Sequence, residues 1–319
     1  MEEKKFDLSQ LYIVDFVKNL GHKKNIFAMI YLALNVLIIT VMLQVFEPNL
    51  WLCLLYGILL YGATATIALS PLGEWFFRLT NGCKKIEDPA IRNRLEPLFE
   101  EVKNQAKIKH PDFIVDDRIA LYMSDDNVLN AFALGRRTVC VTRGLLQLSD
   151  EQIKGVLGHE FGHLASHDTD LSLLITVGNF LITAAVTVFR VVAWLFNLMI
   201  TLVGGIIGGD EGWFVSAMGT LNSWLTTLMI NGLMWVWTQL GILLVMKSSR
   251  DAEYEADAFS CDLGYTQGLL SFFQILDRME GGSSGKERGN IFAALSSSHP
   301  ETHKRIARIN ERQSLPAGK

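Results

Sequence analysis

The chain has 319 residues, of which 50% are hydrophobic and 19% are charged, and its formal net charge is -4. Soluble domains usually carry about 25% charged residues, so this composition indicates membrane segments joined to soluble ones. The slightly negative charge provides no basic surface, and we therefore expect no nucleic-acid partner. The 4 cysteines are scattered without a CxxC pair, which excludes a thiolate zinc motif and a disulfide framework.

Two long uncharged runs follow a charged N-terminal segment, residues 1–25. The first run covers residues 26–46 and the second covers residues 48–73, with a tight turn between them. About 20 apolar residues in a helix cross a hydrocarbon core of about 30 Å. We therefore predict two transmembrane helices within residues 26–70.

Residues 71–170 are richer in charge and are patterned like a soluble domain. A helix with one apolar face is predicted over residues 89–108. Three strands are predicted, over residues 118–123, 130–134 and 138–142. The last two strands form a hairpin whose turn begins at Gly135.

A second apolar block covers residues 171–246, where we predict two further membrane helices. Arg190 interrupts this block, either at the end of a span or inside one, facing protein or water. Residues 247–319 are charged again and include a basic amphipathic helix over residues 301–312.

The distribution of basic residues predicts the orientation of the spans. Five lysines precede the first span: Lys4, Lys5, Lys18, Lys23 and Lys24. The two predicted outer turns, residues 47–50 and 204–212, contain no Lys or Arg. By the positive-inside rule, the N-terminus and both soluble segments are expected in the cytoplasm, as in a protein of the bacterial inner membrane.

The five residues His-Glu-Phe-Gly-His at positions 159–163 carry metal chemistry. In a helix, residues four apart share a face, so His159 and His163 can bind one metal ion. Glu160 lies about 100° round the helix axis. It can therefore polarise a metal-bound water without binding the metal itself. The alternative is a pair of surface histidines.

The helix that carries this motif has a predicted N-cap and a face without large side chains. Ser149 is the predicted N-cap, with Gln152 as its capping-box partner. Gly158 and Gly162 cost helix stability, but they allow another element to approach closely. This context favours a metal site over two surface histidines.

Catalytic zinc usually has three protein ligands and one water. Among the carboxylates at residues 251–257, Glu253 and Asp257 share a helix face, so one can bind the metal while the other supports a ligand histidine. Spacing alone does not choose between them, and an ordinary charged helix is the alternative. If Glu253 meets His163, the apolar block between them must cross the membrane an even number of times.

These features resemble the HtpX-like membrane zinc peptidases, whose superfamily also includes the CaaX prenyl protease. The resemblance extends over residues 20–312. It rests on four ordered motifs: Asn-Ala-Phe-Ala at 130–133, the histidine motif at 159–163, Ser-Arg-Asp-Ala-Glu-Tyr-Glu-Ala-Asp at 249–257, and Ser-His-Pro at 298–300 with Arg305.

The expected fold is mainly α, in the α+β class. It is an integral membrane protein with about four transmembrane helices and a cytoplasmic zincin-like catalytic domain that contains a small sheet. The two parts of that domain are expected at residues 71–170 and 247–319.

The resemblance implies a role for each matched position. His159, His163 and Glu253 would bind one Zn²⁺ per chain, Glu160 would be the general base, and Asp257 would support a ligand histidine. The cleft strand would be formed by Asn130, Ala131, Phe132 and Ala133, where a peptide substrate can add as an extra strand. The alternative for these four residues is a turn followed by a plain core strand.

Two further positions keep two interpretations each. His299 would help to stabilise the oxyanion, or it would only precede a helix that begins at Pro300. Arg305 would be a buried ion-pair partner, or it would belong to an exposed basic face.

The predicted function is that of a zinc-dependent endopeptidase acting on membrane or misfolded proteins at the cytoplasmic face, with the lipid bilayer as its other partner. A bound zinc ion would lower the pKa of its water from 15.7 towards about 7. Glu160 would take the proton of that water and later deliver it to the leaving amine. The alternatives are a prenyl-peptide protease, expected to have more spans, and a membrane scaffold with a vestigial zinc site.

Overall fold

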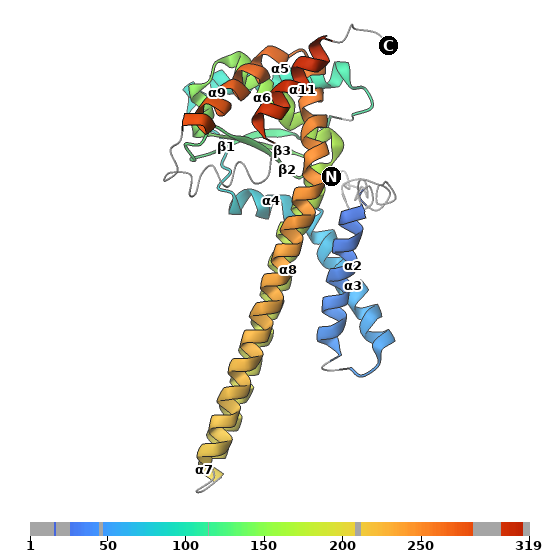
Figure 1. Cartoon of the computed structure of the whole chain (residues 1–319), viewed down its shortest axis with the longest axis vertical. Coiled ribbons are helices and arrows are strands. Elements are labelled where there is room, and N and C mark those ends of the chain that lie inside the picture. The colour runs from blue at the N-terminus through green and yellow to red at the C-terminus, as the bar shows by residue number, and fades with distance from the viewer. Residues whose placement is uncertain are drawn as a thin grey trace, which may run out of the picture.

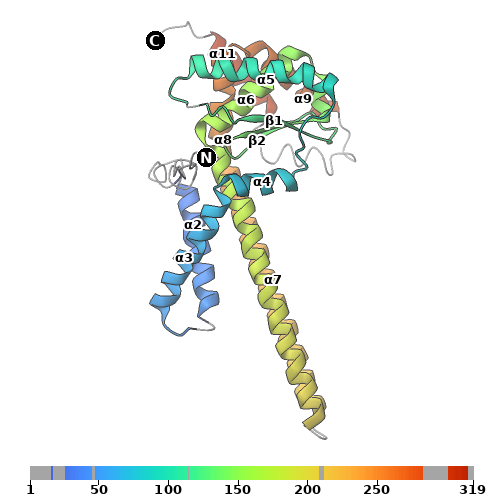
Figure 2. The same ribbon diagram turned by 180° about the vertical axis from the view of Figure 1, so that it is seen from behind.

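The structure is a computed structural model, and it describes residues 16, 26–44, 47–113, 115–207, 212–282 and 301–314. At one end of the long molecule, helices surround a three-stranded sheet (Figures 1 and 2). Two helical hairpins extend from this body towards the other end. A mainly helical fold with a small sheet was predicted and is confirmed.

The first hairpin consists of α2 (Ile26–Leu43) and α3 (Leu50–Ala68). The uncharged run of residues 48–73 continues past the end of α3, and α4 (Pro71–Thr80) begins within it as a separate helix. Its N-cap is Ser70, whose side chain accepts the N–H groups of residues 72 and 73. Proline disfavours helical geometry at the residue before it and suits the first turn of a new helix.

The sheet has the strand order β1-β3-β2, with β1 (Ala120–Ser124), β2 (Ala131–Leu134) and β3 (Thr138–Thr142). The predicted hairpin of β2 and β3 is confirmed as an antiparallel pair, and β1 runs parallel to β3. Gly135 opens the turn with a φ of +57°, a conformation that glycine adopts without steric cost. In this order β2 lies at one edge of the sheet.

The second hairpin follows directly after the helix of the histidine motif. A short 3₁₀ helix, η3 (Arg143–Gln147), leads from the sheet to α6 (Asp150–Ser166), which begins with the predicted capping box at Ser149. His167 takes a φ of 58° at the end of α6. The chain then enters α7 (Asp168–Ile207) and returns along α8 (Gly212–Asp262), and these two helices lie side by side (Figures 1 and 2).

Within the described residues, two helical segments are long and apolar enough to cross a membrane, namely 50–68 and 172–204, and a shorter apolar segment covers 29–43. α7 continues without a break through Arg190. The arrangement of four spans stays a prediction.

The main hydrophobic core joins segments that precede α7 in the sequence to the end of α8 and the helices after it. It is formed by the sheet, α6 and the last turns of α8, together with α5 (Pro89–Lys109), α9 (Thr266–Gly282) and α11 (Thr302–Ser314). Phe99 of α5 and Phe161 of α6 pack with ring centroids 5.5 Å apart. This core fixes α6 against α8 and so holds both halves of the candidate site.

Candidate metal centre

The three predicted ligands meet where α6 packs against the C-terminal part of α8. The Nε2 atoms of His159 and His163 are 3.2 Å apart. The two carboxylate oxygens of Glu253 lie 3.5 Å from Nε2 of His159 and 3.6 Å from Nε2 of His163. His159 and Glu253 are buried, and His163 is partly buried. The structure therefore brings together three groups that are distant in the sequence.

Two glycines of α6 make this approach possible. A Cβ added to Gly162 would lie 2.6 Å from the Cα of Ala256, and one added to Gly158 would lie 2.7 Å from Oγ of Ser260. Real Cβ atoms essentially never come so close to another heavy atom. The close passage that the sequence predicted at these glycines is confirmed, and the element that approaches is α8.

Asp257 and Arg305 surround the ligands. Asp257 lies 2.9 Å from Nδ1 of His159, so the opposite nitrogen of that ring faces the other ligands. Arg305 donates to both carboxylate oxygens of Asp257, at 2.6 and 2.8 Å, and its other terminal nitrogen lies 3.1 Å from Glu253. Its guanidinium also lies over the ring of Phe273, 4.2 Å from the centroid. Of the two interpretations given for Arg305, these contacts support that of a buried ion-pair partner.

Burial and charge act against each other on the ionisable groups of this cluster. Burial disfavours a protonated His159, but its contacts with Asp257 and Glu253 outweigh that effect and raise its pKa to about 9. Burial also disfavours an ionised Asp257, but the charge and hydrogen bonds of Arg305 hold the pKa of Asp257 below its usual range. In the metal-free protein, a proton on His159 thus compensates the buried carboxylates.

Glu160 contacts β2 on the side away from β3. Oε2 of Glu160 accepts the backbone N–H of Ala133 at 2.8 Å. Thr142 of β3 donates to the carbonyl of Asn130, and backbone groups alternate in direction along an antiparallel strand. The N–H and carbonyl groups of Ala131 and Ala133 therefore point away from β3, towards the outer edge of the sheet.

Of the remaining predicted positions, two lie at or in β2 and one lies outside the described residues. Asn130 precedes β2, and Phe132 lies in it with its backbone towards β3. His299 lies outside the described residues, so its predicted role stays a prediction. Two polar residues that were not predicted, Glu74 and Asp170, hold the turn after β2. A single carboxylate within the apolar sequence of α4 was the available signal.

The donor set and its spacing fit a zinc ion. Zinc binds histidine nitrogen and carboxylate oxygen at roughly 2.0–2.2 Å in tetrahedral geometry, which separates two ligand atoms by about 3.3–3.5 Å. In this cluster the two Nε2 atoms are 3.2 Å apart, and they lie 3.5 and 3.6 Å from different carboxylate oxygens of Glu253. One donor atom from each of the three residues lies within 4.8 Å of the others. A histidine whose second nitrogen contacts a carboxylate, as His159 does with Asp257, is the usual support for such a ligand.

The sequence profile named Peptidase family M48 matches residues 89–313, a range that contains every element of this site. The chain belongs to Peptidase family M48. It is 31% identical over 270 residues to Protease HtpX of Shewanella baltica strain OS185, covering 78% of this chain and 83% of that protein. It is 29% identical over 272 residues to Protease HtpX of Yersinia pestis strain Pestoides F, covering 80% and 86% respectively.

Membership in the M48 family confirms the predicted resemblance and enzyme class. This M48 peptidase is a metalloprotease, a hydrolase of peptide bonds, and its substrates are proteins or peptides. The family implies a metal, generally zinc, and the cluster of His159, His163 and Glu253 fits that requirement.

Proposed function

We propose that this M48 peptidase is a membrane-embedded zinc endopeptidase that cleaves membrane or misfolded proteins at the cytoplasmic face of the bacterial inner membrane. The observation that carries the proposal is the cluster of His159, His163 and Glu253 beside Glu160. That cluster lies close to the base of an apolar helical hairpin. Ser172, where the apolar segment of α7 begins, follows His163 by only nine residues.

Each residue of the site has a proposed role. His159, His163 and Glu253 would hold one zinc ion per chain, which supplies a Lewis acid and a water of lowered pKa. Glu160 takes the proton from the attacking water and returns it to the leaving amine. Asp257 holds the ring of His159 in one tautomer and orientation. Arg305 balances the charge of the two buried carboxylates.

The substrate would bind in extended form along β2. Ala131 and Ala133 direct their backbone groups towards the outer edge of the sheet, and a peptide can pair with such an edge whatever its side chains. This mode of binding suits an enzyme that acts on damaged proteins of many sequences. Ala133 donates to Glu160 and also belongs to the proposed binding edge, so substrate and base would meet at one position.

The proposed orientation puts both ends of the chain in the cytoplasm and uses four membrane helices, in α2, α3, α7 and α8. The last part of α8 and α6, which carry the three ligands, lie at the same end of the long hairpin (Figure 1), in agreement with an even number of crossings. Green fluorescent protein fused after Lys319 should fluoresce, and periplasmic alkaline phosphatase fused there should be inactive. The opposite pair of results would contradict the orientation.

The function is tested with the full chain purified in nanodiscs and loaded with zinc, using labelled casein and a labelled single-span membrane protein as substrates. We expect Glu160→Gln to keep about one zinc per chain but to cleave roughly 10²–10⁴-fold more slowly. Glu151→Gln, an exposed change on the same helix, is the matched control and should cleave normally. Equal cleavage by Glu160→Gln and the unaltered chain would overturn the mechanism.

A farnesylated peptide forms the third arm of the same experiment. Rapid cleavage of this peptide, with no cleavage of either unmodified substrate, would indicate a prenyl-peptide protease. Stoichiometric zinc with no hydrolysis of any substrate would indicate a scaffold with a vestigial site.

A further inference from the structure

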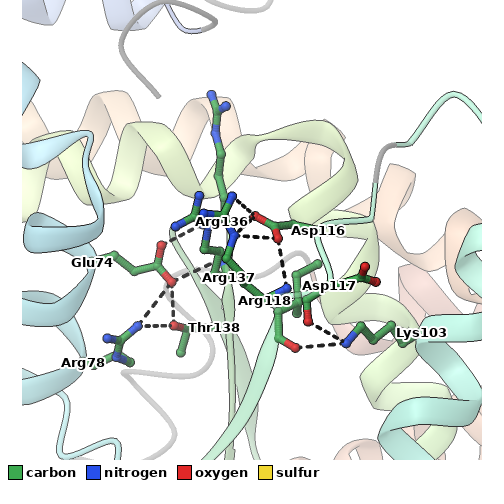
Figure 3. Close-up of polar contacts among 10 residues, drawn as sticks. Glu74, Arg78, Lys103, Asp116, Asp117, Arg118, Arg136, Arg137 and Thr138 are labelled. Atoms are coloured by element: carbon green, nitrogen blue, oxygen red, sulfur yellow. Dashed lines mark hydrogen bonds and ion pairs between the residues drawn. The ribbon is translucent and has the colours of Figure 1, made fainter. Parts of the chain in front are cut away.

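The turn that connects β2 to β3, residues 135–137, is held from one side by a buried carboxylate on α4. Glu74 is only 1% exposed. It accepts the backbone N–H groups of Arg136 and Arg137, each at 3.2 Å, and the hydroxyl of Thr138 at 2.6 Å. Figure 3 shows these contacts converging on the turn. Glycine is required beside them, because a Cβ on Gly135 would lie 2.5 Å from the Glu74 carboxylate.

The first turn of α7 holds the same segment from another side. Thr169 donates its hydroxyl to the carbonyl of Gly135. Asp170, which is 2% exposed, accepts two hydrogen bonds from the guanidinium of Arg136, at 2.7 and 3.2 Å. The turn is therefore fixed by side chains from two different helices, α4 and α7.

Both helices are joined firmly to membrane segments. α4 bends away from α3 so tightly that a Cβ on Gly73 would lie 2.1 Å from the carbonyl oxygen of Ala68. A small apolar cluster then packs the end of α3 against α7 and α4: Ala65, Ala68, Leu69, Leu173, Leu174, Val177, Phe76 and Phe77. The two membrane hairpins thus meet at the point from which Glu74 and Asp170 reach the turn.

The held turn continues directly into the edge of the active site. Gly135 follows Leu134, the last residue of β2, and Ala133 donates its N–H to Glu160. A shift of the turn would displace the proposed peptide-binding edge and the hydrogen bond to the base together. The three zinc ligands lie on α6 and α8, outside this connection.

We propose that Glu74 and Asp170 are positioning residues for the peptidase reaction, through which the two membrane hairpins set the position of the β2 edge. This inference rests on the proposed peptidase function. Charged groups with directional hydrogen bonds specify one location of the turn, whereas apolar packing alone tolerates small sliding movements. The enzyme would then present its substrate edge correctly only while both membrane hairpins are docked together.

The test compares two inhibitors on the zinc-loaded full chain in nanodiscs. Acetohydroxamate contacts the metal and its immediate surroundings, and a hydroxamate with a tetrapeptide tail also contacts the β2 edge. The inhibition constant of acetohydroxamate divided by that of the peptide hydroxamate isolates the contribution of that edge. We expect Glu74→Gln, and separately Asp170→Asn, to reduce this ratio by roughly 10- to 100-fold, because a displacement of about 1 Å has effects of that size. Zinc content should stay at the unaltered value.

The control is Glu96→Gln, an exposed carboxylate on α5, which should leave the ratio unchanged. Hydrogen exchange provides a second measurement that needs no activity, and the amides of residues 131–134 should exchange faster in both variants while those of α5 do not. If Glu74→Gln does not fold, Asp170→Asn and Thr169→Val test the same turn from α7.

The possible failures are distinct. In one case the unaltered protein cleaves peptides, and Glu74→Gln and Asp170→Asn both keep its inhibitor ratio and its exchange rates. This result would overturn the positioning role alone. A loss of affinity for both inhibitors in equal proportion would also overturn it, because that result indicates general loss of structure. Zinc-loaded unaltered protein that cleaves nothing would overturn the proposed function, and the positioning role with it.

Discussion

The backbone N–H of Ala133 donates to the carboxylate of Glu160 at 2.8 Å, across 27 residues of sequence. This contact ties the proposed base to the strand that would hold the substrate. Proline lacks an N–H and is tolerated at strand edges where that group faces away from the ladder. We expect Ala133→Pro to reduce kcat by about tenfold or more, since hydrogen bonds to charged groups contribute about 1.5–3 kcal/mol.

Ala131→Pro is the matched control for that change, because its N–H also points away from β3, whereas the hydrogen bond to Glu160 comes from Ala133. It should raise KM for peptides and leave kcat close to normal. Steady-state kinetics distinguish the two effects. Identical kinetic changes in both variants would mean that the Ala133 contact has no separate role.

The second prediction concerns the distance between α6 and α8. Gly162→Ala places a Cβ 2.6 Å from the backbone of Ala256, which can be relieved only by moving one helix. Because α8 carries Glu253, this movement separates the third ligand from the histidines. We expect zinc affinity, measured by competition with a chelator, to fall by at least about tenfold, comparable to the loss of a supporting contact.

Gly62→Ala is the control for the general effect of adding a methyl group to a helix. A Cβ there would meet nothing within 4 Å, so zinc affinity should not change. An unaltered zinc affinity in Gly162→Ala would show that the close passage of the two helices is not needed for the site.

The third prediction concerns Asp257. Asp257→Asn keeps the side-chain shape but removes the charge that faces Nδ1 of His159 and the guanidinium of Arg305. Loss of such a supporting group typically weakens metal binding by about 10- to 100-fold. The chelator competition assay measures this directly, with Asp262→Asn as an exposed control on the same helix. Full zinc affinity in Asp257→Asn would remove Asp257 from the proposed site.

Arg305 provides a fourth prediction, about metal-free stability. Without the metal, Arg305→Met leaves Glu253 and Asp257 buried without their guanidinium partner, and breaking a buried pair in this way costs about 3–5 kcal/mol. A bound divalent cation would compensate one of those charges. We therefore expect zinc to raise the Tm of Arg305→Met by more than it raises the Tm of the unaltered chain. Equal increases would show that Arg305 and the metal do not compensate the same charge.

The fifth prediction is the pH dependence of zinc binding. Zinc binds a neutral imidazole, and the pKa of His159 in the metal-free protein is about 9. Apparent zinc affinity should therefore rise with pH, by up to about tenfold per unit from this group, and should level off near pH 9. A plateau that begins near the ordinary histidine value of about 6.5 would contradict the raised pKa.

The thermal stability of the metal-free protein should fall, and not rise, as the pH increases towards 9. The folded pKa of His159 is raised above its unfolded value, so its contribution is complete below about pH 6.5 and is lost as the pH rises towards 9. The folded pKa of Asp257 is lowered, so its contribution is present above about pH 4 and is lost as the pH falls. Thermal unfolding of chelator-treated protein should thus give its highest Tm between about pH 4 and 6.5.

Local patterns were enough to predict much of this protein from its sequence. Periodicity predicted α5 and the three strands, Ser149 and Gln152 predicted the start of α6, and spacing predicted that His159 and His163 share a face. These features depend on residues within one or two turns of each other. The start of α4 is also encoded locally, by Ser70 as its N-cap and Pro71 in its first turn.

The tertiary structure decided how distant segments combine. Spacing left Glu253 and Asp257 as equivalent candidates, and the family resemblance favoured Glu253 as the ligand. In the structure Glu253 lies beside both histidine Nε2 atoms while Asp257 faces the other side of the His159 ring. The contacts of Arg305, of Glu74 with the turn, and of Ala133 with Glu160 likewise join residues far apart in the chain. No local pattern encodes such pairs, because they form only when the packed core brings separate helices and strands to fixed positions.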